Sequence, residues 1–238
     1  MFKKISLSIC LLIIFSCNEL QQVVNQLPGS TDTGLSNEMI ANGLKEALDQ
    51  GIEKQVSKLT ETDGYYKNDL VKILLPEELQ KVDKTLRDIG LGNLADEGLK
   101  ILNRAAEDAV SEATPIFVNA VKEMSFTDAK NILLGSNNAA TTYLQNKTTT
   151  ELYDKFHPII NSSFDKVGAD KIWSSIITRY NAIPLTSNVN PDLTDYVTEE
   201  ALSGVYKMIA VEEEEIRTKF SSRSTDILRK VFALQDKN

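Results

Sequence analysis

Residues 93–124, NLADEGLKILNRAAEDAVSEATPIFVNAVKEM, are the longest stretch of the chain with a helical apolar period. Apolar residues recur in it every three or four positions, as on one face of an α-helix. Alanines in the middle of that face let a neighbouring helix approach closely, and Pro115 should kink or divide the helix. We expect this stretch to be the central helix of a bundle. The apolar positions are Leu99, Leu102, Ala106, Ala109, Ala113, Phe117, Ala120 and Met124.

The same period continues on both sides of this stretch. Asp63-Gly64 ends a first helical pattern, and the residues before Pro76 are predicted to be extended, because a residue before proline avoids the α region. Thr148-x-x-Glu151 is a capping box that should start a new helix. The sequence therefore predicts an all-α, single multi-helix, bundle-like domain at 36–238, with room for one short extended segment near 70–75. The further helices are expected at 36–59, 76–89, 125–134, 138–145, 148–167, 170–181, 198–220 and 224–234.

The N-terminus has the pattern of a secretory leader. Lys3 and Lys4 precede about 11 mostly apolar residues, whereas a spanning helix needs about 20. Ser16 directly before Cys17 resembles the lipobox of bacterial lipoproteins. The resemblance implies a signal peptide at 1–16, cleavage before Cys17 and a diacylglycerol on the Cys17 sulfur. The alternative is a plain secreted protein whose leader is cut elsewhere or left uncut.

Residues 17–35 are expected to be the lipidated N-terminus and a flexible tether, because they are polar and contain Pro28, Gly29 and Gly34. Loss of Lys3 and Lys4 with the leader changes the formal charge from −8 to −10. A chain this acidic repels phosphate backbones, so we expect no nucleic-acid partner. Of the two cysteines, Cys10 would leave with the leader and Cys17 would be acylated, so no thiol would remain for a disulfide, a metal cluster or a nucleophile.

His157 is the only histidine of the chain and precedes Pro158. A single histidine excludes HExxH zinc sites and metal clusters with several histidines. A Ser-His-Asp triad would have to use it, yet no Gly-x-Ser-x-Gly elbow occurs. We interpret His157 as a structural or surface residue and predict no metal site and no catalytic residue.

Asn103, Arg104 and Glu107 form the cluster with the clearest binding chemistry. On a helix, Arg104 can meet Glu107 at i,i+3 and Asp108 at i,i+4, among small side chains. A packed guanidinium needs paired acceptors. The functional interpretation is a pocket that grips a carboxylate or an amide, and the alternative is an internal ion pair that sets helix register.

Two further polar stretches favour structural roles. Four consecutive glutamates at 212–215 point in different directions on a helix, and Glu213–Arg217 and Glu215–Lys219 form i,i+4 pairs, so a solvated face is expected. The stretch 137–143 could start a helix over a polar pocket, because free amides at a helix N-terminus attract anions, or it is a capped turn.

Several short stretches after the tether stand out together by their order and spacing. They are Asn103 to Glu107, Met124-Ser125-x-x-Asp128-Ala129 with Ile132-Leu133 and Gly135, Ala139-Ala140-Thr141-x-Tyr143, Tyr196-Val197-Thr198-x-x-Ala201-Leu202, Glu212-Glu213-x-x-Ile216-Arg217 and Val231-Phe232. Together they resemble an uncharacterised bacterial family, domain of unknown function 4197, over nearly all of the chain after the tether. Ser125 stands where threonine is expected, which conserves the capping chemistry. The family implies an exported helical domain and supplies no activity, cofactor or catalytic residue.

The sequence thus predicts a lipid-anchored protein of the bacterial cell envelope, at the outer membrane and facing the periplasm. Its expected partners are the membrane, through the anchor, and an envelope protein or a small ligand. A binding or structural role without a cofactor is favoured over catalysis. The alternatives are a small-ligand or lipid carrier with an apolar cavity between helices, and a hydrolase of envelope polymers that uses carboxylates.

Overall fold

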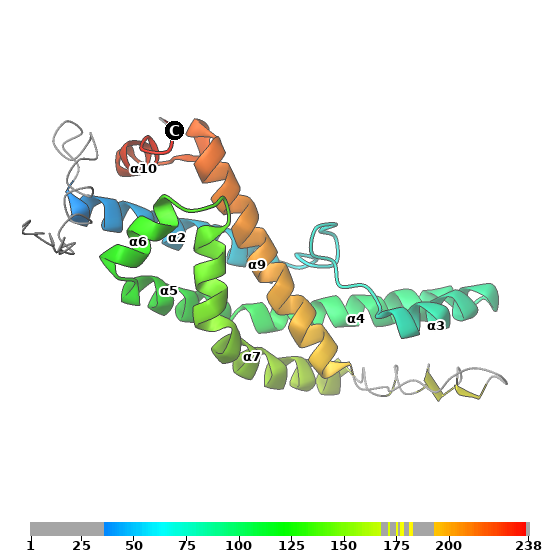
Figure 1. Ribbon diagram of the computed structural model, residues 1–238. Helices are drawn as coiled ribbons and strands as arrows, with labels where there is room; N and C mark the ends of the chain where they lie inside the picture. Colours follow the sequence, from blue (N-terminus) through cyan, green and yellow to red (C-terminus); the bar gives the residue numbers. More distant parts are fainter. Residues whose placement is uncertain are drawn as a thin grey trace, which may run out of the picture. The chain divides into compact units, whose positions relative to one another are not determined.

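The computed structural model describes residues 36–167 and 193–236, together with residues 171, 175, 177, 178, 181 and 182. The predicted leader, Cys17 and the predicted tether lie outside the described residues. Every described residue is helical or in a turn or loop and none is in a strand, which confirms the all-α prediction (Figure 1). The elements are α2 (Asn37–Thr60), α3 (Glu77–Asp88), α4 (Gly92–Val110), α5 (Ala113–Glu123), α6 (Phe126–Leu133), α7 (Ala139–Val167), α9 (Thr194–Thr218), the 3-10 helix η1 (Phe220–Ser222) and α10 (Asp226–Phe232).

The expected central helix is two helices, α4 and α5, separated by a turn at Ser111 and Glu112. Pro115 lies in the first turn of α5. A proline there has no N–H to donate to the carbonyl of Ser111 and its ring crowds that carbonyl, so an uninterrupted helix cannot form across the turn. The predicted division at Pro115 is therefore confirmed, and the break falls just before the proline.

The centre of the fold is α7, whose packing against α4 and against α9 is the most extensive in the domain, and α4 and α9 also pack against each other. The alanines of α4 at 105, 106 and 109 are fully buried, as the apolar period predicts. Phe117 of α5 meets Tyr206 of α9 edge to face, with ring centroids 5.8 Å apart. A second group of contacts joins α2 to α5, α6, α9 and α10.

The expected break at Thr148 is wrong, because α7 runs without interruption from Ala139 to Val167. Inside the helix, the Thr148 hydroxyl bonds back to the Leu144 carbonyl at 2.7 Å and meets the Tyr206 hydroxyl at 2.8 Å. A threonine can satisfy its hydroxyl in this way inside a helix as well as at an N-cap, so the motif alone does not mark a helix start.

The segment between α2 and α3 is non-helical, as predicted. Asp63 has a φ of 71°, and a Cβ on Gly64 would lie 2.4 Å from the Lys58 carbonyl oxygen, so both residues mark a tight turn after α2. Residues 72–76 have no regular secondary structure and lead to Pro76 at the N-cap of α3. This segment and the start of α9 frame the groove described below.

The other predicted helix ends agree with the structure to within a few residues. Ser125 and Asp128 form a capping box at the start of α6, where the helix at 125–134 was expected. The C-terminal helix α10 begins after Thr225, whose side chain accepts a bond from the Leu228 amide. Between residues 171 and 181, each of the five described positions is helical, in line with the helix expected at 170–181.

Candidate functional site

Asn103, one of the predicted site residues, is fully buried and holds the segment before α3. Its side-chain amide pairs with both backbone groups of Ile73: the Ile73 N–H donates to Oδ1 at 2.8 Å, and Nδ2 donates to the Ile73 carbonyl at 2.9 Å. Nδ2 also donates to the Leu99 carbonyl one helical turn earlier. The Asn103 side chain thus satisfies both backbone groups of Ile73, as a neighbouring β-strand would.

Glu107 and Arg104 hold the turn after α2. The Glu107 carboxylate accepts from the amides of Asp63 and Tyr65 at 3.3 and 3.1 Å. Arg104 donates to Glu107 and to the Asp63 carboxylate, both at 2.6 Å. A hydrogen bond from Lys67 and the charge of Arg104 lower the pKa of Asp63. The cluster therefore works inside the chain, and its predicted ligand-binding role stays a prediction.

Asp108, which was considered as the i,i+4 partner of Arg104, binds another helix instead. It accepts a hydrogen bond from the Ser163 hydroxyl of α7 at 2.8 Å. Glu107, one residue earlier on the helix, lies on the side that faces the turn after α2, where Arg104 also reaches. The helix thus sends its two neighbouring acids to different parts of the fold.

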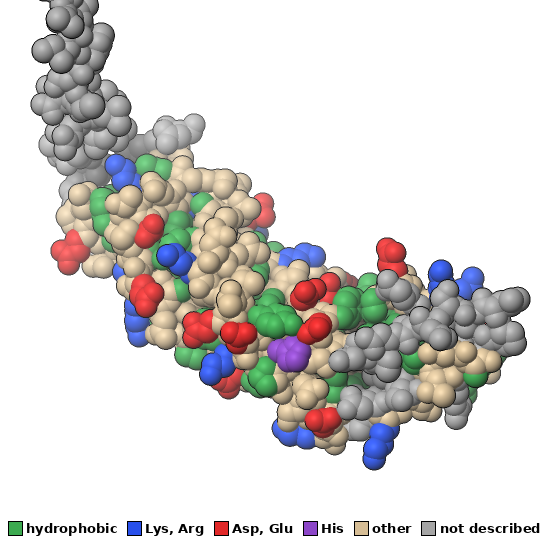
Figure 2. Space-filling view, turned by 60° about the horizontal axis from the view of Figure 1, so that its bottom comes forward, with side chains coloured by type: hydrophobic (Ala, Val, Ile, Leu, Met, Phe, Trp, Pro, Cys, Tyr) green, Lys and Arg blue, Asp and Glu red, His purple; other side chains and the backbone are tan. Residues whose placement is uncertain are grey.

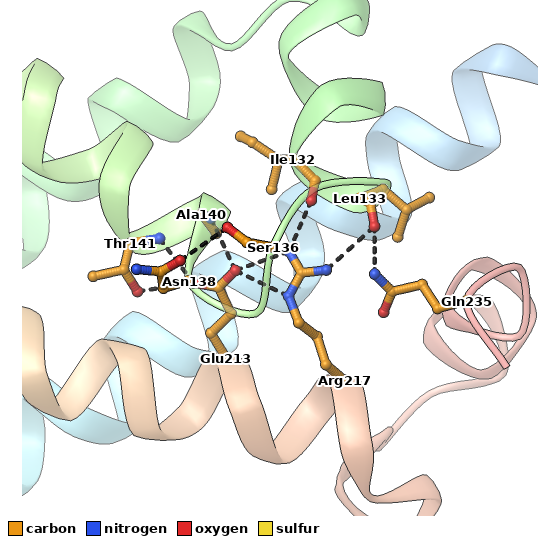
Figure 3. Close-up of polar contacts among 9 residues, drawn as sticks. All are labelled: Ile132, Leu133, Ser136, Asn138, Ala140, Thr141, Glu213, Arg217 and Gln235. Carbon is orange, nitrogen blue, oxygen red and sulfur yellow. Dashed lines mark hydrogen bonds and ion pairs between the residues drawn. The ribbon is translucent and has the colours of Figure 1, made fainter. Parts of the chain in front are cut away.

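A second polar centre, buried between α6, α7 and α9, was not predicted (Figure 3). The Glu213 carboxylate accepts from the backbone amides of Ala140 and Thr141 at 2.9 and 2.8 Å and from the Thr141 hydroxyl at 2.8 Å. Both amides belong to the first turn of α7, so the carboxylate meets the positive end of that helix. Of the two alternatives considered for 137–143, the helix start is present, and its amides hold an acid of the chain itself.

Arg217 completes this centre. It donates twice to Glu213, at 3.0 and 2.8 Å, and to the Ile132 and Leu133 carbonyls at the end of α6. Gln235, beyond α10, donates to the same Leu133 carbonyl. The guanidinium therefore ties the C-terminal end of one helix to the N-terminal end of the next.

These contacts correct the expectation of a solvated glutamate face. Glu212, Glu213 and Arg217 are buried, whereas Glu214 is exposed and Glu215 pairs with Lys219 at 2.9 Å. The predicted i,i+4 pairs of Glu213 and Glu215 are both present. Pair spacing is the same on a buried and on an exposed face, so the sequence pattern could not separate the two cases.

Glu212, the first of the four glutamates, is bound by α2. Lys54 and Gln55 of α2 donate to its two carboxylate oxygens at 2.7 and 2.5 Å. The cavity lined by Glu212, Glu213 and the neighbouring apolar residues measures about 20 Å³. That is room for about one water molecule. The interior next to the glutamates is thus filled by the protein's own side chains.

His157 lies at the surface, with 40 % of its side chain exposed, and acidic side chains lie beside it (Figure 2). Its Nε2 is 3.0 Å from Oδ1 of Asp195, and the Tyr153 hydroxyl donates to the same oxygen at 2.7 Å. These two contacts, the tyrosine hydrogen bond first, lower the pKa of Asp195. The trio connects α7 to the first turn of α9.

An open groove of about 450 Å³ lies between the segment leading into α3 and the start of α9. Its volume falls in the range of about 300–1,000 Å³ that is common for ligand sites. Leu74 is 57 % exposed beside it, and the Tyr196 hydroxyl donates to the Leu74 carbonyl at 2.8 Å. The lining combines apolar and charged side chains: Lys72, Leu74, Leu75, Pro76, Glu77, Gln80, Tyr196 and Glu200.

The groove residues were not predicted as a site. The non-helical run before Pro76 and the Tyr196-Val197-Thr198 stretch were each visible in the sequence, but they are separated by about 120 positions. Only folding brings them together, and Asn103 holds one wall of the groove through Ile73. Of the predicted cluster, Asn103 thus supports the groove, and none of the three residues lines it.

No helix in the described part of the chain combines the length and the apolar content that a bilayer crossing requires. No three His, Cys, Asp or Glu side chains in that part of the chain are grouped to hold a metal ion. Cys17, the predicted lipidation site, lies outside the described residues.

Comparison with known proteins gives a family. Residues 34–233 match the family described as "Protein of unknown function (DUF4197)". No curated protein and no solved structure is significantly similar to the chain. The match includes α2 through α10 and every residue of the groove. The chain therefore belongs to the DUF4197 family.

Proposed function

We propose that this protein is a lipid-anchored binding module of the bacterial cell envelope, held at the outer membrane and facing the periplasm. The leader-like start and Cys17 support the anchor, and the acidic composition argues against nucleic acid as a partner. The partner is a segment of an envelope protein bound in the groove between residues 72–80 and the start of α9.

The groove is the observation that carries this proposal. Leu74, Leu75 and Pro76 offer apolar contact, while Lys72, Glu77 and Glu200 offer charges of both signs. An amphiphilic peptide segment matches this mixture better than a uniformly apolar lipid chain does. The wall is also preorganised, because Asn103 holds Ile73 through both of its backbone groups, which lowers the entropic cost of binding.

The carrier alternative has less support. A carrier needs an enclosed apolar space that accepts most of a ligand's surface, commonly about 300 Å³ or more. The cavity beside Glu212 and Glu213 is about 20 Å³.

The hydrolase alternative has one observation in its favour. Glu77 and Glu200 both line the open groove, so two carboxylates are available there. Hydrolysis of a glycosidic bond uses such a pair on opposite sides of the scissile bond. A hydrolase should release soluble fragments from purified cell-wall polymer. If the purified chain does so, and if Glu77→Gln and Glu200→Gln each abolish this release, the hydrolase is favoured over the binding module.

Site-specific photo-crosslinking in intact cells tests the binding role. A photoreactive residue at position 74 should form a discrete adduct, whereas the same residue at position 89 should not. Ile89 is the matched control because it is 62 % exposed, close to the 57 % of Leu74, and lies outside the groove lining. Equal adducts at both positions would contradict a groove-specific partner.

The captured protein must then bind in isolation. Purified partner should bind the purified chain. Glu200→Lys, which reverses a charge in the groove, should raise the Kd. Glu214→Lys, on the exposed part of α9, should leave the Kd unchanged. The anchor is tested separately by the intact mass of protein extracted from membranes. A mass without an acyl-modified Cys17 N-terminus would remove the anchor and leave the binding role to be judged by the Kd.

A further inference from the structure

The segment that leads into α3 has one buried and one open face. Val71, Ile73 and Leu75 are at most 7 % exposed, whereas Lys72 is partly exposed and Leu74 is 57 % exposed. Burial that alternates with a period of two is typical of an extended backbone, because successive side chains of a strand point to opposite sides. This stretch is therefore extended, although no second strand pairs with it in the described part of the chain.

One edge of this segment is already paired. In an extended backbone, the N–H and C=O groups of alternate residues point to opposite edges. Both groups of Ile73 are bound by the Asn103 side chain, at 2.8 and 2.9 Å. The groups of Leu74 therefore belong to the other edge. Tyr196, which lines the groove, donates to the Leu74 carbonyl at 2.8 Å, so this other edge faces the groove.

The edge that faces the groove is only half satisfied. The Lys72 N–H donates to the Asn68 carbonyl at 2.8 Å, and the Leu74 carbonyl is bound by Tyr196. The Leu74 N–H and the Lys72 carbonyl have no partner among the residues that the structure describes. These two groups flank Ile73 and point to the same edge. A single residue of a parallel strand satisfies both of them, because it donates to the first and accepts from the second.

The groove is acidic on balance. Glu77 and Glu200 are exposed in its lining, and no cation of the described residues forms an ion pair with either. The one base of the lining, Lys72, places its ammonium 4.4 Å from the centre of the Tyr66 ring. The chain as a whole also has a charge of −8. Two uncompensated carboxylates favour a partner that brings basic side chains to the groove.

We propose that the groove takes a basic, extended segment of its partner, which adds as a parallel strand to residues 72–74. The inference rests on the proposed binding role of the groove and gives the conformation and charge of the bound segment. One residue of the partner donates to the Lys72 carbonyl and accepts from the Leu74 N–H. Apolar side chains of the segment pack on Leu74, and basic ones pair with Glu77 and Glu200. This is β-strand addition in which the receiving edge is a single segment held by α4.

Two other occupants match these observations less well. A helical partner satisfies its own backbone groups and leaves the Leu74 N–H and the Lys72 carbonyl to water. A second copy of this chain, related by a two-fold axis, brings the same segment in antiparallel and needs both groups of one residue. Lys72 and Leu74 each have one of these groups already bound, and two acidic grooves repel each other.

The test uses a defined peptide, acetyl-Lys-Val-Lys-Val-Lys-Val-Lys-amide, and the isotope-labelled full chain, whose backbone amides are followed by NMR. Saturable binding should move the Leu74 amide proton downfield and slow its exchange with solvent. The same peptide with glutamate in place of lysine should bind about tenfold more weakly or less. Glu77→Gln/Glu200→Gln should remove this preference for the lysine peptide.

N-methylation of the peptide tests the strand conformation without any change to the protein. Successive residues of a bound strand point their N–H groups alternately toward and away from the receiving segment. One peptide carries N-methyl groups on all its valines and another carries them on all its lysines. One of the two should lose binding and the other should keep it.

Leu74→Pro tests the same hydrogen bond from the side of the protein. It removes an N–H that no described residue binds, and Ile73 before it is extended, as a residue before proline prefers, so Tm should hold. Leu74→Ala is the matched control, because it loses the leucine side chain but keeps the N–H. The Kd of the lysine peptide should be about tenfold higher for Leu74→Pro than for Leu74→Ala.

The outcomes separate strand addition from the binding role itself. No binding at millimolar peptide, equal effects of the two N-methylated peptides, or equal Kd values for Leu74→Pro and Leu74→Ala would each overturn strand addition. Stronger binding of the glutamate peptide would overturn the basic charge of the segment. In these cases a discrete adduct at position 74 but not at 89 in intact cells still supports the binding role. Absence of both the peptide complex and the adduct would overturn both proposals.

Discussion

Replacement of Glu213 by glutamine should destabilise the fold more than any other change of similar size on α9. The carboxylate accepts five hydrogen bonds, three from the start of α7 and two from Arg217. Glutamine keeps the shape but brings an NH₂ group toward donors and leaves the guanidinium without its counter-charge. An amide cannot accept at both of its ends, so at least one buried donor loses its partner.

The magnitude follows from burial. Breaking a buried ion pair from one side costs about 3–5 kcal/mol, because the remaining charge is uncompensated. Unfolding a domain of about 200 residues loses about 2–4 °C of Tm per kcal/mol, so Glu213→Gln should lower Tm by roughly 6–20 °C. Arg217→Met leaves Glu213 with its three α7 donors. The double variant Glu213→Gln/Arg217→Met should be less destabilised than the sum of the two single variants by about 1–3 kcal/mol.

Urea unfolding followed by circular dichroism measures these differences, provided the m-value stays constant. Glu214→Gln is the matched control, because the Glu214 side chain, next to Glu213 in the sequence, is exposed. This variant should change the free energy of unfolding by less than about 0.5 kcal/mol. If Glu213→Gln falls within about 1 kcal/mol of this control, or if the double variant is strictly additive, the buried pair does not hold the helices as described.

Three further changes test other parts of the fold. Asn103→Ala should cost about 2–4 kcal/mol in urea unfolding, because both buried backbone groups of Ile73 lose their partner; a cost under about 1 kcal/mol would contradict this. Gly204→Ala should cost about 1–3 kcal/mol, since its Cβ would lie 2.7 Å from the buried Tyr65 ring, and an unchanged Tm would refute the close contact. Burial raises the pKa of Asp49 above its unfolded value, so wild type should lose stability relative to Asp49→Asn as pH rises from about 3.5 to 7, and a difference that is constant with pH would refute that sign.

Much of the helical pattern could be predicted from local signals. The capping box at Ser125, the turn at Asp63-Gly64 and the break next to Pro115 act within a few residues, so each appears in the sequence and in the structure. Thr148 shows the limit of such signals. The same hydroxyl that caps a helix start can bond to the preceding turn, and only the packing of α7 against α9 through Tyr206 decides between the two.

The candidate sites were harder to predict. Asn103, Arg104 and Glu107 were found from their chemistry, yet their partners, among them Asp63 and Ile73, lie at least 30 residues earlier in the chain. The groove between residues 72–80 and α9 depends on pairs of residues more than 100 positions apart, such as Leu74 and Tyr196. No periodicity encodes such a pair.

The sequence by itself determined that this chain forms helices, where most of them begin and end, and which face of each is apolar, because capping, proline geometry and the 3.6-residue period act along the chain. Only the tertiary structure decided which charged groups are buried. Glu213 and Glu214 are neighbours with the same side chain, yet one meets the first amides of α7 and Arg217 while the other meets water. Whether a carboxylate loses its hydration depends on what packs over it, and that is a property of the assembled helices.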